Sequence, residues 1–229
     1  MSGDGEQGQG AGVLPHATGI FDTVVVIDEM PGFAELNRAL KHILQSRQTQ
    51  SPGVEVSNVG GWQSDRQMLH WGGEAAQRLS SRMIAAADRF TVDIAAAGER
   101  RFQWVAEMWG NISPPQASNQ FHTHPGAFWS AVYYVDDGYS GSSDRNLGGE
   151  LVLQDPRMPM IMMAMPTLRF VRPGRPRDEP ELSMRPQAGR IVMFPAWLNH
   201  CVRRYKGKSE RISVAMNLSA MPLHALSRQ

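Results

Sequence analysis

The sequence predicts a mainly β protein with helices packed outside a sandwich or barrel, and three observations support this fold class. Beyond about residue 102, short strand-like segments alternate with turn formers, as in β-sandwiches and barrels. Two segments with helical periodicity precede that region. The 229 residues suffice to bury one large core without disulfides or a structural metal. We expect one domain over residues 13–229, and a disordered glycine-rich tail over residues 1–12.

The first part of the chain supplies one expected strand and two expected helices. Residues 19–27 form a β-branched run that is typical of a buried strand. Residues 33–48 are expected to be helical, because four apolar residues recur three or four positions apart: Phe33, Leu36, Leu40 and Ile43. A second helix is expected over residues 73–90, with one face made of Ala76, Leu79, Met83, Ala86 and Ala87.

Six later segments have the length and composition of strands. They cover residues 101–112, 128–137, 148–155, 189–197, 201–205 and 211–218. Residues 155–188 interrupt this series, because their seven prolines exclude central strands and regular helix. This methionine-containing segment is expected either to form a long surface excursion or to act as a lid at the mouth of an active site.

The overall composition excludes several classes of protein. The formal net charge is +1, so nothing in the charge favours nucleic acid or an anionic membrane as a partner. No stretch of 18 apolar residues is present, so no membrane span is expected. Cys201 is the only cysteine, which rules out a disulfide within the chain and favours a cytoplasmic location. The oligomeric state stays open between a monomer and a homodimer.

Three histidines and one arginine have a spacing that suggests a metal site. His122 and His124 lie two residues apart, so in a strand their side chains would share one face. His200 follows 78 residues after His122, and Arg211 eleven residues later. Three ligand atoms on one face of an octahedron leave three positions open, as non-haem Fe(II) needs for a bidentate cosubstrate and oxygen. The guanidinium of Arg211 suits a carboxylate, which it can hold in bidentate fashion.

The chain resembles the prokaryotic 2-oxoglutarate/Fe(II) oxygenases of the prolyl-hydroxylase-like superfamily. The resemblance extends over nearly the whole chain after the tail. It is carried by SNVGGWQSD (57–65), WGNI (109–112), HTHPGAFWSAVYYV (122–135), LQDPR (153–157), GRIVMFPAWLNHCV (189–202) and ERISVAMNL (210–218). It implies a double-stranded β-helix, that is, a jelly roll or cupin-like barrel, together with Fe(II) and 2-oxoglutarate.

The resemblance also implies roles for individual residues. His122 matches the first iron-binding histidine and His200 the distal one. Arg211 matches the arginine that pairs with the far carboxylate of 2-oxoglutarate, and Ser213 the hydroxyl two residues on. Two further residues are candidates for hydrogen bonds into the same pocket, or else for packing in the barrel; they are Asn111 and Tyr134.

One position departs from the superfamily and leaves three interpretations open. The usual carboxylate ligand two residues after the first histidine is here His124. His124 could itself be the third ligand. Alternatively, Asp155 or Asp136 could supply a carboxylate from elsewhere in the chain. In the third interpretation His124 and His200 form the histidine pair, and Gly126 stands at the carboxylate position, which is left open for water or halide.

The expected activity is a 2-oxoglutarate-dependent hydroxylation of an unactivated carbon, with molecular oxygen and a small-molecule or peptide substrate as partners. One alternative is a cupin-like dioxygenase with three histidines and no 2-oxoglutarate. Another is a β-helix protein that binds a metal or ligand without catalysis. A buried arginine for a diacid argues against the first alternative, and the fold by itself cannot separate them.

Overall fold

The structure is a computed structural model that describes residues 20–95, 100–171, 174 and 177–223. The expected disordered tail, residues 1–12, lies outside the described residues. Each helix within them is too short or too polar to span a bilayer.

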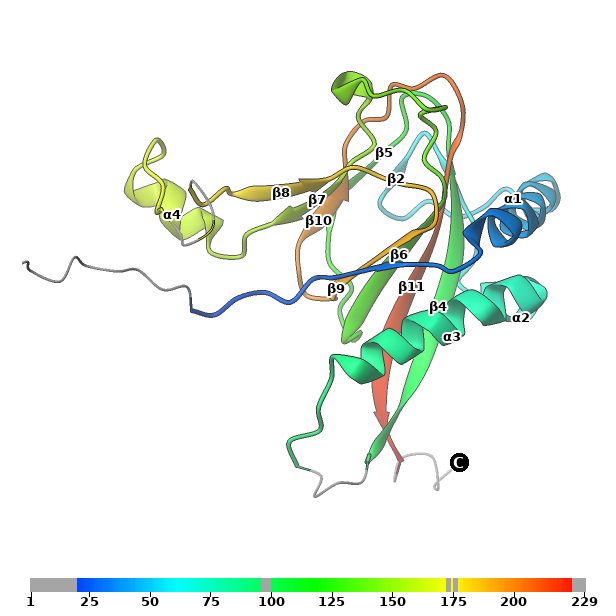
Figure 1. Cartoon of the computed structure of the whole chain (residues 1–229), viewed down its shortest axis with the longest axis horizontal. Coiled ribbons are helices and arrows are strands. Elements are labelled where there is room, and N and C mark those ends of the chain that lie inside the picture. The colour runs from blue at the N-terminus through cyan, green and yellow to red at the C-terminus, as the bar shows by residue number, and fades with distance from the viewer. Residues whose placement is uncertain (1–19, 96–99, 172–173, 175–176, 224–229) are drawn as a thin grey trace, which may run out of the picture.

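Two antiparallel sheets face each other and form the body of the molecule (Figure 1). The larger sheet has the order β1-β9-β6-β11-β4-β3. Its strands are β1 (Val26–Glu29), β9 (Arg190–Pro195), β6 (Trp129–Asp136), β11 (Arg211–Pro222), β4 (Phe102–Ser113) and β3 (Trp62–Gln63). The smaller sheet has the order β2-β5-β10-β7-β8. Its strands are β2 (Asn58–Val59), β5 (Ser118–His122), β10 (His200–Val202), β7 (Leu151–Gln154) and β8 (Glu181–Met184). This arrangement confirms the predicted double-stranded β-helix.

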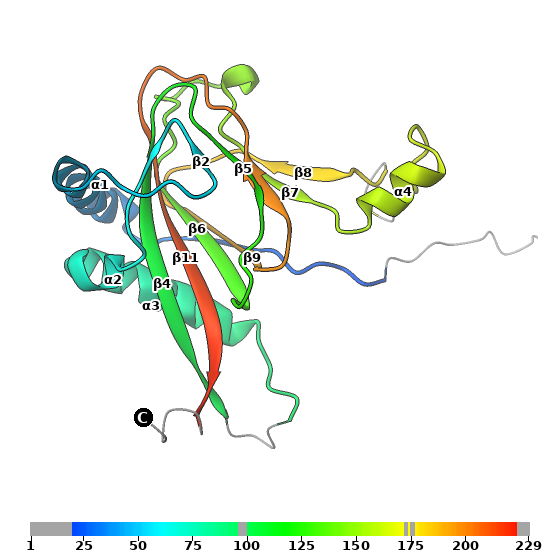
Figure 2. The same cartoon turned by 180° about the vertical axis from the view of Figure 1, so that it is seen from behind.

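Three helices lie on the outer face of the larger sheet (Figures 1 and 2). They are α1 (Phe33–Gln50), α2 (Met68–Trp71) and α3 (Gly73–Arg89). Helix α1 buries Leu36, Leu40 and Leu44 against this sheet. Leu44 sits directly over Gly110 of β4, where a side chain would collide with it. A large part of the apolar core therefore lies between the helices and the outer face of the sheet, which leaves the opposite face of the sheet free to line a cavity.

The sheet register places residues of one strand on opposite faces in strict alternation. In β11, Ile212, Val214, Met216 and Leu218 are buried in the core under the helices. The residues between them point to the inner side, toward the smaller sheet. Because β11 pairs with β4 along twelve residues and with β6 on its other edge, this assignment of faces is fixed by two neighbours.

Several details differ from the sequence-based expectations. The first strand begins at Val26 and is an edge strand, so Ile27 is 57% exposed instead of buried. The buried stripe of α1 ends on Leu44 instead of Ile43, and Phe33 is 42% exposed. The expected face of α3 is confirmed, except that Ala86 is only partly buried and Ser80 joins it. Strands β2, β3, β5 and β8 were not expected.

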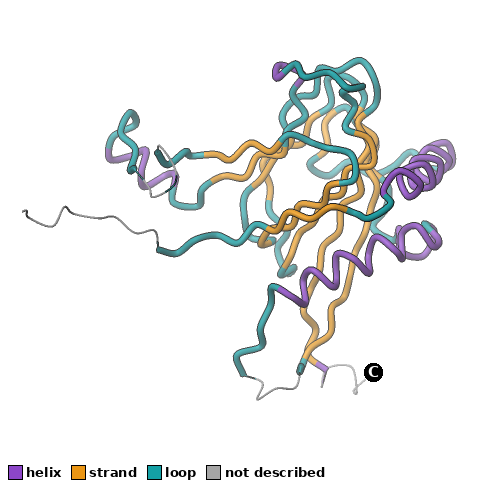
Figure 3. Tube along the Cα trace, in the orientation of Figure 1, coloured by secondary structure: helices purple, strands orange, loops and turns teal. Residues whose placement is uncertain are grey.

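The proline-rich segment forms an arm at the edge of the smaller sheet (Figure 3). It consists of the short helix α4 (Met158–Ala164) and the edge strand β8, with Met160 and Met163 exposed. Helix α4 contradicts the expectation that the prolines exclude regular helix, because Pro159 lies in its first turn, where a missing N–H is tolerated. The base of the arm lies beside His200, which pairs with Leu153 of β7. None of its described residues between 156 and 184 lines the cavity next to the histidines. The segment is thus a surface excursion, and in this structure it does not cover the site as a lid.

The packing of α1 on the sheet gives a stability prediction. Leu40→Ala should lower the free energy of unfolding by about 2–5 kcal/mol, because Leu40 is fully buried and its loss leaves a cavity. Arg38→Ala is the control on the same helix; Arg38 is exposed, so its loss should change stability by less than about 0.5 kcal/mol. Urea unfolding measures both variants. Equal losses would show that α1 does not pack on the sheet as described.

Candidate metal and cosubstrate site

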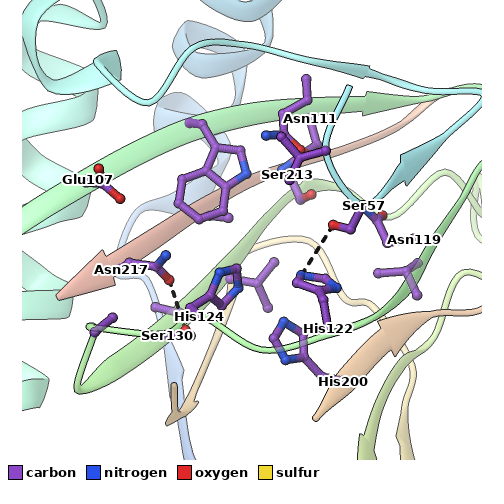
Figure 4. A pocket seen from close by; sticks show the side chains of 18 of the residues that line it. Ser57, Glu107, Asn111, Asn119, His122, His124, Ser130, His200, Ser213 and Asn217 are labelled. Atoms are coloured by element: carbon purple, nitrogen blue, oxygen red, sulfur yellow. Dashed lines mark hydrogen bonds between the residues drawn. The ribbon is translucent and has the colours of Figure 1, made fainter. Parts of the chain in front are cut away.

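Three imidazole rings meet between the two sheets (Figure 4). His122 ends β5 and His200 begins β10, and these two residues face each other in the pairing of the two strands. The ring centroids of His122 and His200 are 4.3 Å apart, and His124 lies 5.0 Å from each of them. One ring nitrogen from each residue lies within 4.8 Å of the other two, so the three could hold a single metal ion.

His124 reaches this cluster by a route that differs from the sequence-based expectation. The HxH pair does not lie on one strand, because β5 ends at His122 and His124 occupies the turn that follows. The backbone N–H of His124 donates to the carbonyl of Ala196 at 2.9 Å, in the turn that leads to His200. This hydrogen bond ties His124 to the same turn and brings its ring beside the other two.

Backbone hydrogen bonds orient two of the three rings. The Nδ1 atom of His122 lies 2.7 Å from the carbonyl oxygen of Gln120, and Nδ1 of His200 lies 2.8 Å from that of Leu198. An Nδ1–H that donates to a carbonyl leaves Nε2 unprotonated, which is the usual arrangement for a metal-binding histidine. Nε2 of His122 also lies 3.4 Å from the hydroxyl of Ser57.

All three imidazoles are held in the neutral form that binds metals. Burial lowers the pKa of His122, lowers that of His124 to about 4, and lowers that of His200 to about 3. The mutual repulsion of the charged rings adds to this effect for His124 and His200. At neutral pH the cluster therefore offers three lone pairs and no positive charge.

A cavity of about 330 Å³ opens between the histidines and the inner face of the larger sheet. Arg211 and three further predicted residues line it. Tyr134, Ser213 and Asn111 form one row across β6, β11 and β4, since Ser213 pairs with Tyr134 on one side and with Asn111 on the other. The structure thus brings together all seven residues that the sequence suggested for the site.

Arg211 is a buried cation without an ionic partner among the described residues. Arg211 is only 2% exposed, and its Nε–H has no hydrogen-bond acceptor. The hydroxyl of Tyr134 is also buried and makes no hydrogen bond of good geometry, although it lies close to Arg211, whose guanidinium carbon is 5.2 Å from the Tyr134 ring. Burial raises the pKa of the Tyr134 hydroxyl, so it stays protonated as a donor. Two unsatisfied donors beside one cavity fit a bound carboxylate.

The two carboxylates considered as alternative ligands lie elsewhere. Asp155 binds Arg157 at 2.6 Å and lines a separate surface groove. Asp136 accepts a hydrogen bond from Lys41 at 2.9 Å and is absent from the lining of the cavity. Gly126 lies in the turn after His124, in a left-handed conformation with φ of 89° and open space around its α-carbon.

Several cavity residues were not predicted from the sequence. Trp109, Glu107, Ser130 and Asn217 line the cavity, together with Ser57 from the loop before β2. Alternation of side chains along the strand could have identified Asn217. Once Arg211 and Ser213 are assigned to the cavity, Asn217 must lie on the same face of the strand.

A second, larger hollow of about 1180 Å³ lies beside the site. Its walls come from the segment before β1, the base of the arm and the turn before His200. Ala127 lines both this groove and the histidine cavity, so the two adjoin. Exposed aromatic residues border the groove, among them Phe21, Phe128 and Trp197.

Solved structures share this fold at low sequence identity. A Pseudomonas putida prolyl-4-hydroxylase matches with a TM-score of 0.57 and 18% identity, over 86% of this chain and 92% of that one. A Trichoplax adhaerens prolyl hydroxylase matches with a TM-score of 0.59 and 14% identity, over 90% and 87%. HygX from Streptomyces hygroscopicus, solved with nickel and 2-oxoglutarate, matches with a TM-score of 0.55 and 12% identity, over 88% and 83%.

No curated protein sequence matches the chain. Residues 107–217 match the family described as "Putative 2OG-Fe(II) oxygenase". The matched region runs from β4 to β11 and includes the three histidines and Arg211. The family implies Fe(II) and 2-oxoglutarate as cofactor and cosubstrate. On this match, residues 107–217 belong to the 2OG-Fe(II) oxygenase family, and the chain is an oxygenase of that kind.

Proposed function

We propose that His122, His124 and His200 hold the iron of this oxygenase and that Arg211 binds the far carboxylate of 2-oxoglutarate. The observation that carries this proposal is the buried guanidinium of Arg211, which has no ionic partner among the described residues and lines the same cavity as the three imidazoles. A desolvated cation is costly unless a charged ligand completes it. A diacid that spans from the metal to Arg211 can bind the metal with one end and pair with the guanidinium at the other.

His124 is the third metal ligand in this proposal. It is favoured over Asp155 and Asp136 because those carboxylates are engaged by Arg157 and Lys41 outside the cavity. The interpretation with an open position beside Gly126 is disfavoured because His122 also belongs to the cluster, with its ring centroid 4.3 Å from that of His200 and 5.0 Å from that of His124. An all-histidine face is chemically suited to Fe(II), for which imidazole is a common ligand.

Fe(II) with 2-oxoglutarate and O2 supplies the oxidation of a substrate C–H bond to C–OH, with succinate and CO2 as the other products. The residues of the chain bind and orient the cosubstrate and exclude water from the site. Arg211 fixes one end of the cosubstrate, while Ser213, Tyr134 and Asn111 offer hydrogen bonds along its length. Trp109 closes the space beside His124, with ring centroids 5.8 Å apart. We propose hydroxylation of an unactivated carbon as the outcome.

Two other functions make different demands on the cavity. A cupin-like three-histidine dioxygenase without 2-oxoglutarate would use the same imidazoles, but it has no use for a buried arginine that awaits a carboxylate. A β-helix protein that binds a ligand without catalysis would release no succinate. Succinate release in the presence of Fe(II), 2-oxoglutarate and a substrate separates these functions from the proposed one.

Loss of His122 or of His200 should abolish metal binding. His122→Ala and His200→Ala should each reduce Fe(II) stoichiometry to near zero under anaerobic conditions, because two imidazoles hold the ion far more weakly than three. His42→Ala is the control, since His42 is exposed on α1. Iron content after desalting measures the result, and circular dichroism checks the fold. Full iron affinity in either variant would remove that residue from the ligand set.

The role of His124 has its own test. His124→Asp should retain iron, since it restores the commoner face of two histidines and a carboxylate. His124→Ala should weaken iron binding, because only two imidazoles remain to hold the ion. In a metal-bound crystal structure, a ring nitrogen of His124 should lie about 2.0–2.2 Å from the ion. A distance above about 3 Å, with a carboxylate oxygen in its place, would contradict the assignment.

Arg211 should control the cosubstrate and leave the metal unaffected. Arg211→Leu should weaken 2-oxoglutarate binding by at least about 2 kcal/mol, roughly thirtyfold in Kd, because the carboxylate loses its charged partner. Arg203→Leu is the matched control, since Arg203 is exposed and pairs with Glu181 on the surface. Calorimetric titration of the Zn(II)-loaded protein gives the Kd. An unchanged Kd would favour the three-histidine dioxygenase without 2-oxoglutarate.

A further inference from the structure

The inner face of the larger sheet carries three successive rows of side chains across β6, β11 and β4. The first row is Tyr134, Ser213 and Asn111, and the second is Val132, Ala215 and Trp109. The third row, here called the outer polar row, is Ser130, Asn217 and Glu107. All nine residues line the histidine cavity. Two polar rows are thus separated by one that is mostly apolar.

Asn217 is the central residue of the outer polar row and is held in a fixed orientation. It is 6% exposed and Ser130 is 2% exposed, so both are largely withdrawn from water. The Ser130 hydroxyl donates to Oδ1 of Asn217 at 2.9 Å. Among the described residues no acceptor is recorded for the Nδ2 group of Asn217, which lines the cavity. A buried amide with one end satisfied and the other end facing a cavity is a donor prepared for a ligand.

Glu107 supplies an acceptor beside this donor, and its charge is already balanced. One carboxylate oxygen accepts from Arg66 at 3.1 Å, and both side chains are about half exposed at the edge of the cavity. The Arg66 guanidinium carbon also lies 5.8 Å from the Trp109 ring centroid. Since the pair is neutral as a whole, the row does not favour a charged ligand. It offers a donor and an acceptor to a neutral group.

The outer polar row and the proposed cosubstrate residues lie on the two sides of His124. Ser213 and Asn217 are four residues apart on one strand, which is about 13 Å at the usual rise. Figure 4 shows Asn217, Ser130 and Glu107 on one side of His124, and Asn111 and Ser213 on the other. A diacid bound between the metal and Arg211 therefore leaves the outer polar row free.

We propose that the outer polar row is the substrate-recognition site and that it binds a neutral group with both a hydrogen-bond acceptor and a donor, such as a carboxamide or a hydroxyl. Asn217 donates to the acceptor of this group, and Glu107 accepts from its donor. The inference rests on the proposed function, because it uses the position of the metal between the two polar rows. A site built to hydrogen-bond a ligand rejects an analogue that lacks the group, since its own polar atoms are then left unpaired.

Four small probes test this selectivity on protein loaded with Zn(II) and 2-oxoglutarate, which cannot turn over. N-methylacetamide and N,N-dimethylacetamide differ by one N–H donor, and glycerol differs from its trimethyl ether by its hydroxyl donors. Saturation-transfer NMR compares their binding up to roughly 100 mM, a range suited to ligands of this size. We expect at least one donor-bearing probe to bind at least tenfold more tightly than its capped analogue. The identity of that probe distinguishes an amide-bearing from a hydroxyl-bearing substrate.

Asn217→Leu should reduce binding of the preferred probe at least tenfold and leave the Kd of 2-oxoglutarate within about twofold, because the cosubstrate residues are remote from it. Ser130→Ala is the second variant, should the first fail to fold; it frees the amide and should weaken the same probe. Arg211→Leu is the reciprocal control for the cosubstrate. Equal binding of probe and capped analogue, unchanged binding in both variants, or no binding of any probe would overturn the inference. Failure of 2-oxoglutarate to bind the wild-type protein would instead overturn the proposed function.

Discussion

The alternation of side chains along β11 determines where the core ends and where the site begins. Its even-numbered residues from Ile212 to Leu218 are fully buried under the helices, and its odd-numbered residues from Arg211 to Ser219 line the cavity. A shift of one residue would exchange the two sets and place a guanidinium in the core. Pairing with β4 and β6 on both edges prevents that shift. The same hydrogen bonds that build the sheet therefore also position Arg211 and Asn217.

The residues that lower the stability of the fold lie on the inner face of β11 and its neighbour β6. Arg211 is buried with an Nε–H that has no acceptor, and the buried Tyr134 hydroxyl beside it makes no hydrogen bond of good geometry. Unsatisfied buried donors of this kind destabilise a fold by roughly 1–3 kcal/mol each, and more when charged. The large core under α1 and α3 offsets this cost in the unliganded protein. A ligand that satisfies the donors stabilises the folded state by an amount that grows with its concentration relative to its Kd, so at the proposed site stability would depend on cosubstrate binding.

Much of this arrangement could be predicted from the sequence, for reasons that particular residues make clear. The strand over residues 211–218 could be predicted because β-branched and apolar residues alternate with small polar ones. His122, His124 and His200 were found by their spacing, although the geometric reason given for the first two was wrong. The turn that carries His124 depends on a hydrogen bond to Ala196, a contact between segments 72 residues apart that no local pattern reveals.

Other features required the structure because they depend on partners distant in the sequence. The helical period could not decide between Ile43 and Leu44, and the choice depends on Gly110, whose missing side chain makes room for Leu44. β5 is short and polar, and only its pairing with β10 makes it a strand. Glu107 and Ser130 read as ordinary strand residues until the register places them on either side of Asn217.

The charge balance of the proposed centre explains why its two ends belong together. Three neutral imidazoles add no negative charge, so Fe(II) would carry its full double charge into a cavity that already holds the Arg211 cation. The like charges at the two ends repel each other, and burial of Arg211, which is 2% exposed, strengthens this repulsion. A dianionic cosubstrate between them neutralises the metal and pairs with the guanidinium at once. With a carboxylate at position 124, part of that neutralisation would come from the protein instead. In the proposed centre, an all-histidine face would therefore couple binding of the metal and binding of the diacid more strongly than a face of two histidines and a carboxylate would.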